Sequence, residues 1–392
     1  MPSILTRPSG GGAAPAPSGG YVPPSDWLTL PTVNSGDNKF VGVVAVFDQD
    51  NNYITFNATT DGGTWSVDWG DGNTQTGIAS GVTAEHKLSY SGATGALTTR
   101  GFKTALVTIT VDSGNFTGMD LVEPHSEATD QYYQPWLDVR MAANLSSWGS
   151  YSTGAEPILG MLERFDWIGP NSLNQGDSMF ISCKALRSVV NLDTSAWLRA
   201  TQFIRNTPLI EFPVFDTSSM TLGILLPDTQ LDEITITDTD QITSGSISFQ
   251  GSILKHITIQ NTGVGNRTSL QACFSTTPNL IGTPDLGDTS GVTNWLAFCI
   301  NSGIRTMAAH DLSGATNMTS WVSGCHNLSR ILAFGATITH SIANCNLDVD
   351  AIEEYATNLG DGTGQTLTTS NNPASGSWNT TIATAKNWTV VD

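Results

Sequence analysis

The sequence predicts a mainly β protein in four parts: an extended N-terminal arm over residues 1–35, a β-sandwich over 36–118, a repeat solenoid over 119–348 and a small helical cap over 349–392. Three observations carry this prediction. Apolar residues alternate with period two up to about residue 112, then recur at an interval of about 24 residues, and near the C-terminus take a helical spacing.

The interval in the middle of the chain belongs to nine apolar residues. Consecutive members lie 22 to 26 residues apart, which is typical of a solenoid whose units bury their apolar faces against one another. The residues are Leu137, Leu162, Leu186, Leu209, Leu231, Leu254, Leu280, Ile304 and Leu328. A solenoid presents a long, rigid surface, so this pattern favours a scaffold or recognition protein over an enzyme.

The charge balance excludes two classes of partner. The chain has 16 basic and 35 acidic residues and a net charge of −19, so it repels nucleic acid and anionic lipid at long range. Charged residues make up only 13 % of the chain, so Ser, Thr, Asn and Gly must cover most of the surface. Solvated β proteins of virions and of the extracellular space have this composition.

Residues 1–35 are rich in Gly, Pro, Ser and Ala, with a few apolar residues between them. A disordered tail is one interpretation, and an arm whose apolar residues attach to a neighbouring subunit is the one we favour. The candidate attachment residues are Ile4, Leu5, Tyr21, Trp27 and Leu28. The first residues lack the apolar core of a secretory signal, and the sequence has no apolar run long enough to span a bilayer, so we expect no membrane insertion.

The alternating segment reads as five short strands, and a tight hairpin is expected at the Asp-Gly turn of residues 67–72. It resembles the polycystic-kidney-disease-type (PKD-type) immunoglobulin-like domain. The resemblance rests on Trp69-Gly70-Asp71-Gly72, on His86 and Tyr90, and on the closing strand over 105–109. It implies an immunoglobulin-like sandwich that acts as a structural or adhesive module without catalytic residues.

A turn signal recurs in the solenoid as Asp193-Thr194-Ser195, with counterparts at Asp216, Asp288 and Asp311. Asp and Ser side chains at these places can hydrogen-bond the backbone where each coil leaves its strand. Together with Phe180, Cys183 and Leu186, this turn resembles the BspA-like leucine-rich repeats, and Trp321, Cys325 and Leu328 match in part. The resemblance implies a leucine-rich-repeat solenoid.

The five cysteines are odd in number and contain no CxxC pair. Cys273, Cys299 and Cys325 lie 26 residues apart, roughly one repeat, so we expect all five to be small buried residues with free thiols rather than disulfides or zinc ligands. Reduced thiols fit assembly in a cytoplasm.

The C-terminal segment over 347–360 has the spacing of an amphipathic helix. Its apolar residues are Ile352, Tyr355, Ala356 and Leu359, and Gly360 marks its end. A turn, a short helix and a last strand are expected over 371–391, and together they would close the open end of the solenoid.

No catalytic motif is present, and we predict no enzyme, no cofactor and no metal site. Asp48, Asp50 and Asn52 imitate the start of a calcium loop, but Tyr53 stands where that loop needs Gly and Thr59 where it needs Glu. The histidines show no ligand spacing, and the recurring aspartates are explained by turns.

Three aromatic residues follow an acidic stretch between sandwich and solenoid: Tyr132, Tyr133 and Trp136. They could bind sugar or a neighbouring subunit at the surface, but packing between the two parts is the interpretation that we favour.

The ending after residue 347 also resembles the closing segment of repeat proteins of bacteriophage virions. Together with the features above, this resemblance favours a structural protein of a tailed-bacteriophage virion, as a tail-fibre, adsorption or surface-decoration subunit. Its arm would attach to capsid, portal, adaptor or tail proteins, and its solenoid would face a host-surface glycan or protein or a neighbouring subunit. We expect a homo-oligomer on the virion surface, assembled in the cytoplasm of the host bacterium. A bacterial cell-surface adhesin is the alternative, and a polysaccharide depolymerase is a further one.

Overall fold

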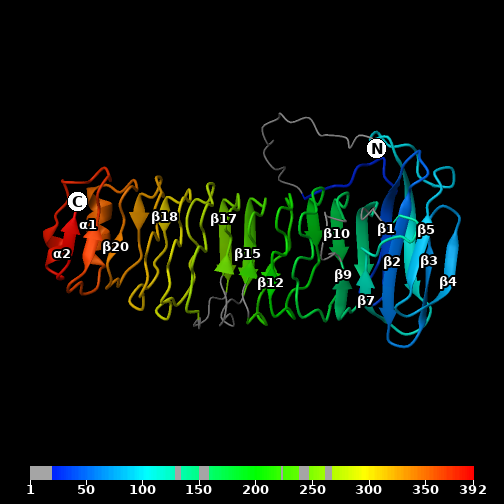
Figure 1. The fold of residues 1–392 in the computed structure, drawn as a ribbon, viewed down its shortest axis with the longest axis horizontal. Helices are drawn as coiled ribbons and strands as arrows, with labels where there is room; N and C mark the ends of the chain where they lie inside the picture. The colour runs from blue at the N-terminus through cyan, green and yellow to red at the C-terminus, as the bar shows by residue number, and fades with distance from the viewer. Residues whose placement is uncertain (1–19, 129–133, 150–158, 222–223, 238–246, 261–266) are drawn as a thin grey trace.

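The computed structural model describes residues 20–128, 134–149, 159–221, 224–237, 247–260 and 267–392, which form one elongated rod (Figure 1). Layered strands make up the blue and cyan end, and coils stack along the long axis from there to the red C-terminal end. The chain is mainly β and contains a β-solenoid of about nine turns, as its periodicity predicts.

Seven strands form two layers at the N-terminal end. They are β1 (Lys39–Val46), β2 (Tyr53–Thr60), β3 (Thr64–Asp68), β4 (Thr74–Ala79), β5 (Thr83–Lys87), β6 (Lys103–Val111) and β7 (Phe116–Asp120). One layer has the order β1-β6-β3-β4 and the other the order β5-β2-β7. Phe40 of β1 packs on Phe56 of β2 with ring centroids 5.1 Å apart, so alternating apolar residues of both layers share one core.

These layers differ from the sequence prediction in two respects. β4 and β7 come in addition to the five predicted strands, and β4 completes the hairpin expected at the Asp-Gly turn. The constant-type immunoglobulin sandwich places its first strand with the second and fifth, and its seventh with the third and sixth. Here β1 pairs with β6 and β7 pairs with β2, so the first and last strands occupy the opposite layers.

The layers continue into the solenoid without a break. β8 (Trp136–Ala142) pairs antiparallel with β1 and parallel with β10 (Arg164–Trp167), which pairs with β11 (Ser188–Val190), so one seven-stranded sheet crosses the junction. In the other layer, β9 (Ser147–Gly149) pairs parallel with β7. The boundary expected near residue 118 therefore lies inside a continuous hydrogen-bonded structure.

Short parallel strands connect the following coils. They are β12 (Ala200–Thr201), β13 (Phe215–Asp216), β14 (Ile224–Leu225), β15 (Glu233–Thr237), β16 (Ile247–Ser248), β17 (His256–Gln260), β18 (Thr306–Met307), β19 (Arg330–Ile331), β20 (His340–Ser341), β21 (Thr366–Thr368) and β22 (Thr389–Val391). Paired residues of neighbouring coils are separated by 21 residues at Phe215 and Ile236 and by 27 at His340 and Leu367, which brackets the predicted period.

The predicted line of core residues is confirmed for eight of its nine members, which share one apolar core, whereas Leu137 is buried on the opposite face of the sheet. All nine members are buried, and the most exposed of them, Leu231, is 2 % exposed. Aromatic rings of successive coils also contact one another: the ring centroids of Phe249 and Phe274 are 5.8 Å apart in a stacked pair, and those of Phe274 and Phe298 are 5.2 Å apart in an edge-to-face pair. One apolar core thus extends from the sandwich to the C-terminal coils.

The recurring aspartates act at turns, as predicted. Asp193 accepts the backbone N–H of Ser195 at 3.0 Å, and the same bond forms from Asp216, Asp288 and Asp311 to the residue two positions on. The Thr194 hydroxyl also donates to the backbone oxygen of Asp216 in the next coil at 2.8 Å. Each turn therefore helps to join two coils.

The predicted C-terminal helix is α1 (Val349–Thr357), with Asp348 accepting from the N–H of Ala351 at 2.9 Å. Its predicted apolar residues are buried. The segment 349–392 is more than a cap, because β20, β21 and β22 pair in parallel and continue the solenoid to the end of the chain. α2 (Thr381–Thr384) lies in the last coil, and α1 packs beside β19.

Candidate functional site

The described part of the predicted arm lies on the protein's own sheet. Trp27 is 6 % exposed and packs with Leu30 and Val33, and Leu28 packs against this group. They cover a second apolar face of the sheet, which consists of Val41, Val43, Ala45, Phe102, Leu137 and Ala142. β1 is apolar on both faces, so its outer face needs a cover, and residues 20–33 supply it. We call residues 20–33 the strap.

Polar contacts also hold the strap. Asp26 accepts both the N–H and the hydroxyl of Thr99 at 2.8 Å, and Arg140 donates to the Pro31 oxygen at 3.2 Å. Tyr21 donates its hydroxyl to the Glu163 carboxylate. Tyr21, Trp27 and Leu28, which the sequence predicts to attach to a neighbouring subunit, thus contact their own chain. Ile4 and Leu5 lie outside the described residues.

Under the strap, the outer face of β8 and β10 carries a balanced network of charges. Arg140 Nε lies 2.9 Å from Asp166 Oδ2, and Arg164 Nη2 lies 3.3 Å from the same oxygen. Arg164 Nη1 is 3.8 Å from Asp138 Oδ2. Burial raises the pKa of Asp138 to about 6, and the two arginines oppose that rise only in part. A cavity of about 260 Å³ separates this network from the strap.

Of the three junction aromatics, Trp136 is fully buried and the two tyrosines, Tyr132 and Tyr133, lie outside the described residues. Trp136 meets Phe40 edge-on with ring centroids 5.2 Å apart. Its indole therefore packs in the core between sandwich and solenoid, which is the interpretation favoured from the sequence, and it is not available for binding at the surface.

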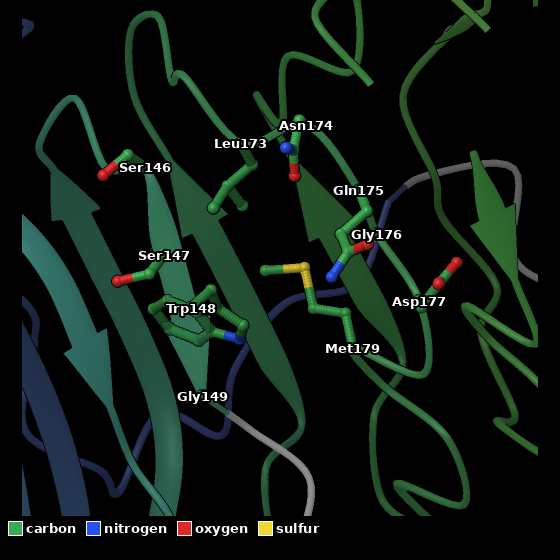
Figure 2. A pocket seen from close by; sticks show the side chains of 10 residues that line it. All are labelled: Ser146, Ser147, Trp148, Gly149, Leu173, Asn174, Gln175, Gly176, Asp177 and Met179. Carbon is green, nitrogen blue, oxygen red and sulfur yellow. The ribbon is translucent and has the colours of Figure 1, made fainter. Parts of the chain in front are cut away.

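A groove opens on the opposite side of the junction, where the second layer ends. β9 is the edge strand of its sheet. In the next coil, Gln175 pairs with Arg199 of the coil after it, and the described residues show no strand pairing between Gln175 and β9. The cavity between them has a volume of about 310 Å³ (Figure 2). We call it the seam groove, and its lining consists of Ser146, Ser147, Trp148, Gly149, Leu173, Asn174, Gln175, Gly176, Asp177 and Met179.

One wall of the seam groove is aromatic. Figure 2 shows the Trp148 ring beside the cavity, with Met179 across from it. Trp148 is partly exposed, and Phe165 and Trp167 support it at centroid distances of 5.4 and 5.5 Å. Its indole N–H is shielded and has no acceptor among the described residues, so the ring presents carbon atoms to the groove.

The other wall is polar and fixed in place. Asn174 and Gln175 are exposed, and Asp177 is held by Arg199, whose Nε lies 2.6 Å from Asp177 Oδ2. The backbone between them packs closely on the core, because a Cβ at Gly176 would lie 1.9 Å from the Trp197 ring. The groove thus combines an apolar ring, two exposed amide side chains and a neutralised carboxylate.

Several groups with strongly perturbed pKa values lie in the core of the coils. Desolvation lowers the pKa of His310 and of His340 to about 4, and burial raises the pKa of Cys183 to about 12. In the sandwich, Asp71 is buried beside His86 at 2.8 Å, and hydrogen bonds from Ser89 N–H and His86 outweigh desolvation and lower its pKa. Within the described ranges, no three His, Cys, Asp or Glu side chains are grouped to hold a metal ion.

Sequence analysis did not find the residues of the seam groove. Trp148 lies in β9, whereas Asn174 and Gln175 lie in the coil that follows, so the groove brings together residues that are far apart in the sequence. Comparison of the chain with protein-family models, with curated proteins and with solved structures gives no match in any of the three. No helix in the described part of the chain is long and apolar enough to cross a membrane.

Proposed function

We propose that this chain is a structural subunit displayed on the surface of a tailed-bacteriophage virion. The observation that supports this role best is the seven-stranded sheet across the junction, which joins sandwich and solenoid into one stiff rod. At about 4.8 Å per coil, nine turns extend about 43 Å, a length suited to holding a binding surface away from a particle.

The resemblances belong to this proposal. Trp69 stacks on His86 at 5.3 Å, and both come from the motif shared with PKD-type domains. The Asp-Thr-Ser turns stack from coil to coil, as a BspA-like leucine-rich repeat would need. Both modules serve structural or adhesive roles, in keeping with a display subunit that carries no cofactor.

The strap changes which residues attach the chain to the particle. Residues 20–33 cover the protein's own sheet, so we assign attachment to other virion proteins to residues 1–19. Deleting residues 1–19 should abolish incorporation into particles and leave unchanged the urea concentration at which half of the protein is unfolded (the midpoint). A deletion of residues 1–33 should also lower the midpoint, because it removes Trp27. Normal incorporation of the shorter deletion would contradict the assignment.

The location of the protein tests the proposed function itself. Immunogold electron microscopy of particles released from producing cells should place the chain on virions. Label confined to the cell envelope would instead indicate an adhesin, and release of reducing ends from host polysaccharide would indicate a depolymerase. Either result would overturn the proposal.

A further inference from the structure

The seam groove has the features of a sugar site, and we propose that it binds a neutral hexose unit of a bacterial surface polysaccharide. This inference rests on the proposed function, which directs the rod toward a host surface. The groove volume of about 310 Å³ lies at the lower end of the range for small-ligand sites, which suits a single sugar ring and not a folded peptide.

The aromatic wall supplies the apolar contact. A pyranose ring has a face of C–H groups, which packs on an aromatic ring when that ring is open to the ligand and held rigidly. Trp148 meets both conditions, because its carbon atoms border the groove while Phe165 and Trp167 support it from the core. The ring needs little reorganisation on binding, which favours affinity.

The polar wall supplies hydrogen bonds for sugar hydroxyls. The Asn174 side chain has no hydrogen bond to any described residue, so its oxygen and its nitrogen are both available. Gln175 uses its oxygen to accept from Arg199 Nη2 at 3.0 Å, which leaves its NH₂ group to donate. Ser146 and Ser147 lie on the side of β9, but Figure 2 shows their hydroxyl oxygens directed away from the cavity, and Ser146 donates its hydroxyl to the Thr117 oxygen at 3.1 Å. Amide donors and acceptors across the groove from an apolar ring match a ligand that carries hydroxyls around its rim.

Charge restricts the ligand to a neutral sugar. The carboxylate of Asp177 is the only charged group that lines the groove in the described part of the chain, and Arg199 neutralises it. With no unpaired cation there and a net charge of −19, the protein gives an anionic polysaccharide no partner and repels it.

Saturation-transfer NMR on the full chain tests the proposal with isomaltohexaose, mannohexaose and galactohexaose as neutral probes and a hyaluronan hexasaccharide as the anionic probe. We expect at least one neutral probe to bind, with an affinity that changes little between 50 and about 300 mM salt because no charge is neutralised. Trp148→Ala should weaken binding about tenfold or more, as expected for a central aromatic contact. Trp148→Phe should retain part of it.

Trp148 also packs on the core, so a second variant separates binding from folding. Asn174→Ala combined with Gln175→Ala changes only exposed side chains and should weaken binding several-fold, whereas Asn327→Ala, an exposed asparagine far along the solenoid, should leave it unchanged. Failure of every neutral probe, preference for the anionic probe, or full binding by the double variant would overturn the proposal. Immunogold labelling measures the location of the protein independently of sugar binding. If the chain binds sugar but is absent from virions, the proposed function is wrong and the assignment of the groove as a sugar site is still supported.

Discussion

At the scale of single residues, the interior of the coils keeps its buried histidines uncharged. His340 donates Nδ1–H to the Ile338 oxygen at 2.7 Å and pairs through Nε2 with the Tyr355 hydroxyl at 2.7 Å. His310 contacts Thr283 at 3.2 Å and packs between Trp295 and Phe298. Both imidazoles are fully buried, so protonation would place a charge in an apolar core.

This burial predicts acid sensitivity. Folding lowers the pKa of both histidines from about 6.5 to about 4, so the unfolded chain binds more protons between those values and stability falls as the pH drops from 6.5. At pH 5 each histidine should lower the free energy of unfolding by about 2 kcal/mol. Asp138 acts in the opposite direction, because its raised pKa favours the folded state below pH 6. At pH 5 it should restore about 1 kcal/mol of the free energy of unfolding that the histidines remove.

Urea unfolding at pH 7.5 and pH 5 measures this effect, with a lower midpoint expected at pH 5. His310→Leu should remove about half of the pH-dependent loss of stability, because it removes one of the two imidazoles. Thr283 would remain hydrogen-bonded in this variant, since its hydroxyl also accepts the Ala308 N–H at 2.9 Å. Equal midpoints at the two pH values would contradict the burial of both imidazoles.

The cysteines give a second residue-scale prediction. All five are buried and free, as the sequence predicts, and Cys325 Sγ donates to the Cys299 oxygen at 2.8 Å. An Ellman titration of the native protein should therefore find no fast-reacting thiol, and the same titration of the urea-unfolded protein should find five reactive thiols. A native disulfide or a rapidly modified thiol would be inconsistent with this packing.

At the scale of elements, the strap stabilises a strand that is apolar on both faces. The sequence already carried this signal, because β1 reads Phe40-Val41-Gly42-Val43-Val44 where a half-exposed strand would alternate. The pattern shows that a cover is needed, but it does not show which segment provides it. The apolar residues of the arm were recognised from sequence, whereas their docking on the same chain depends on tertiary packing.

Trp27→Ala tests the strap. The indole is buried under the Arg100 guanidinium, which lies 5.2 Å from the ring centroid, so we expect a loss of about 3 kcal/mol in the free energy of unfolding. Val22→Ala is the matched control in the same segment, because Val22 is 80 % exposed and should change little. Equal stability of the two variants, measured by urea denaturation, would show that the strap does not hold the sheet.

The repeating elements were predictable because each repeats its chemistry. The line of core residues, the Asp turns and the helix at 349–357 could all be predicted from the spacing of residues along the sequence. Features that occur once were not predictable: the strand order of the sandwich and the seam groove arise where two architectures meet, and no periodic signal marks either of them.

At the scale of the whole molecule, one hydrogen-bonded sheet and one apolar core run through the junction. Bending there would break the pairing of β1 with β8 and expose Trp136. The protein should therefore behave as a single stiff body in solution, not as two domains on a linker. The proposed display role depends on this stiffness.

Electron–electron double resonance between two spin labels tests the stiffness most directly. Labels on Thr76→Cys in β4 and Glu233→Cys in β15 report across the junction, and both positions are exposed while the native cysteines are buried. Glu233→Cys with Arg330→Cys is the control pair within the solenoid. We predict one distance peak across the junction, as narrow as that of the control pair. A broad or two-peaked distribution across the junction, with a narrow control, would contradict the continuous rod.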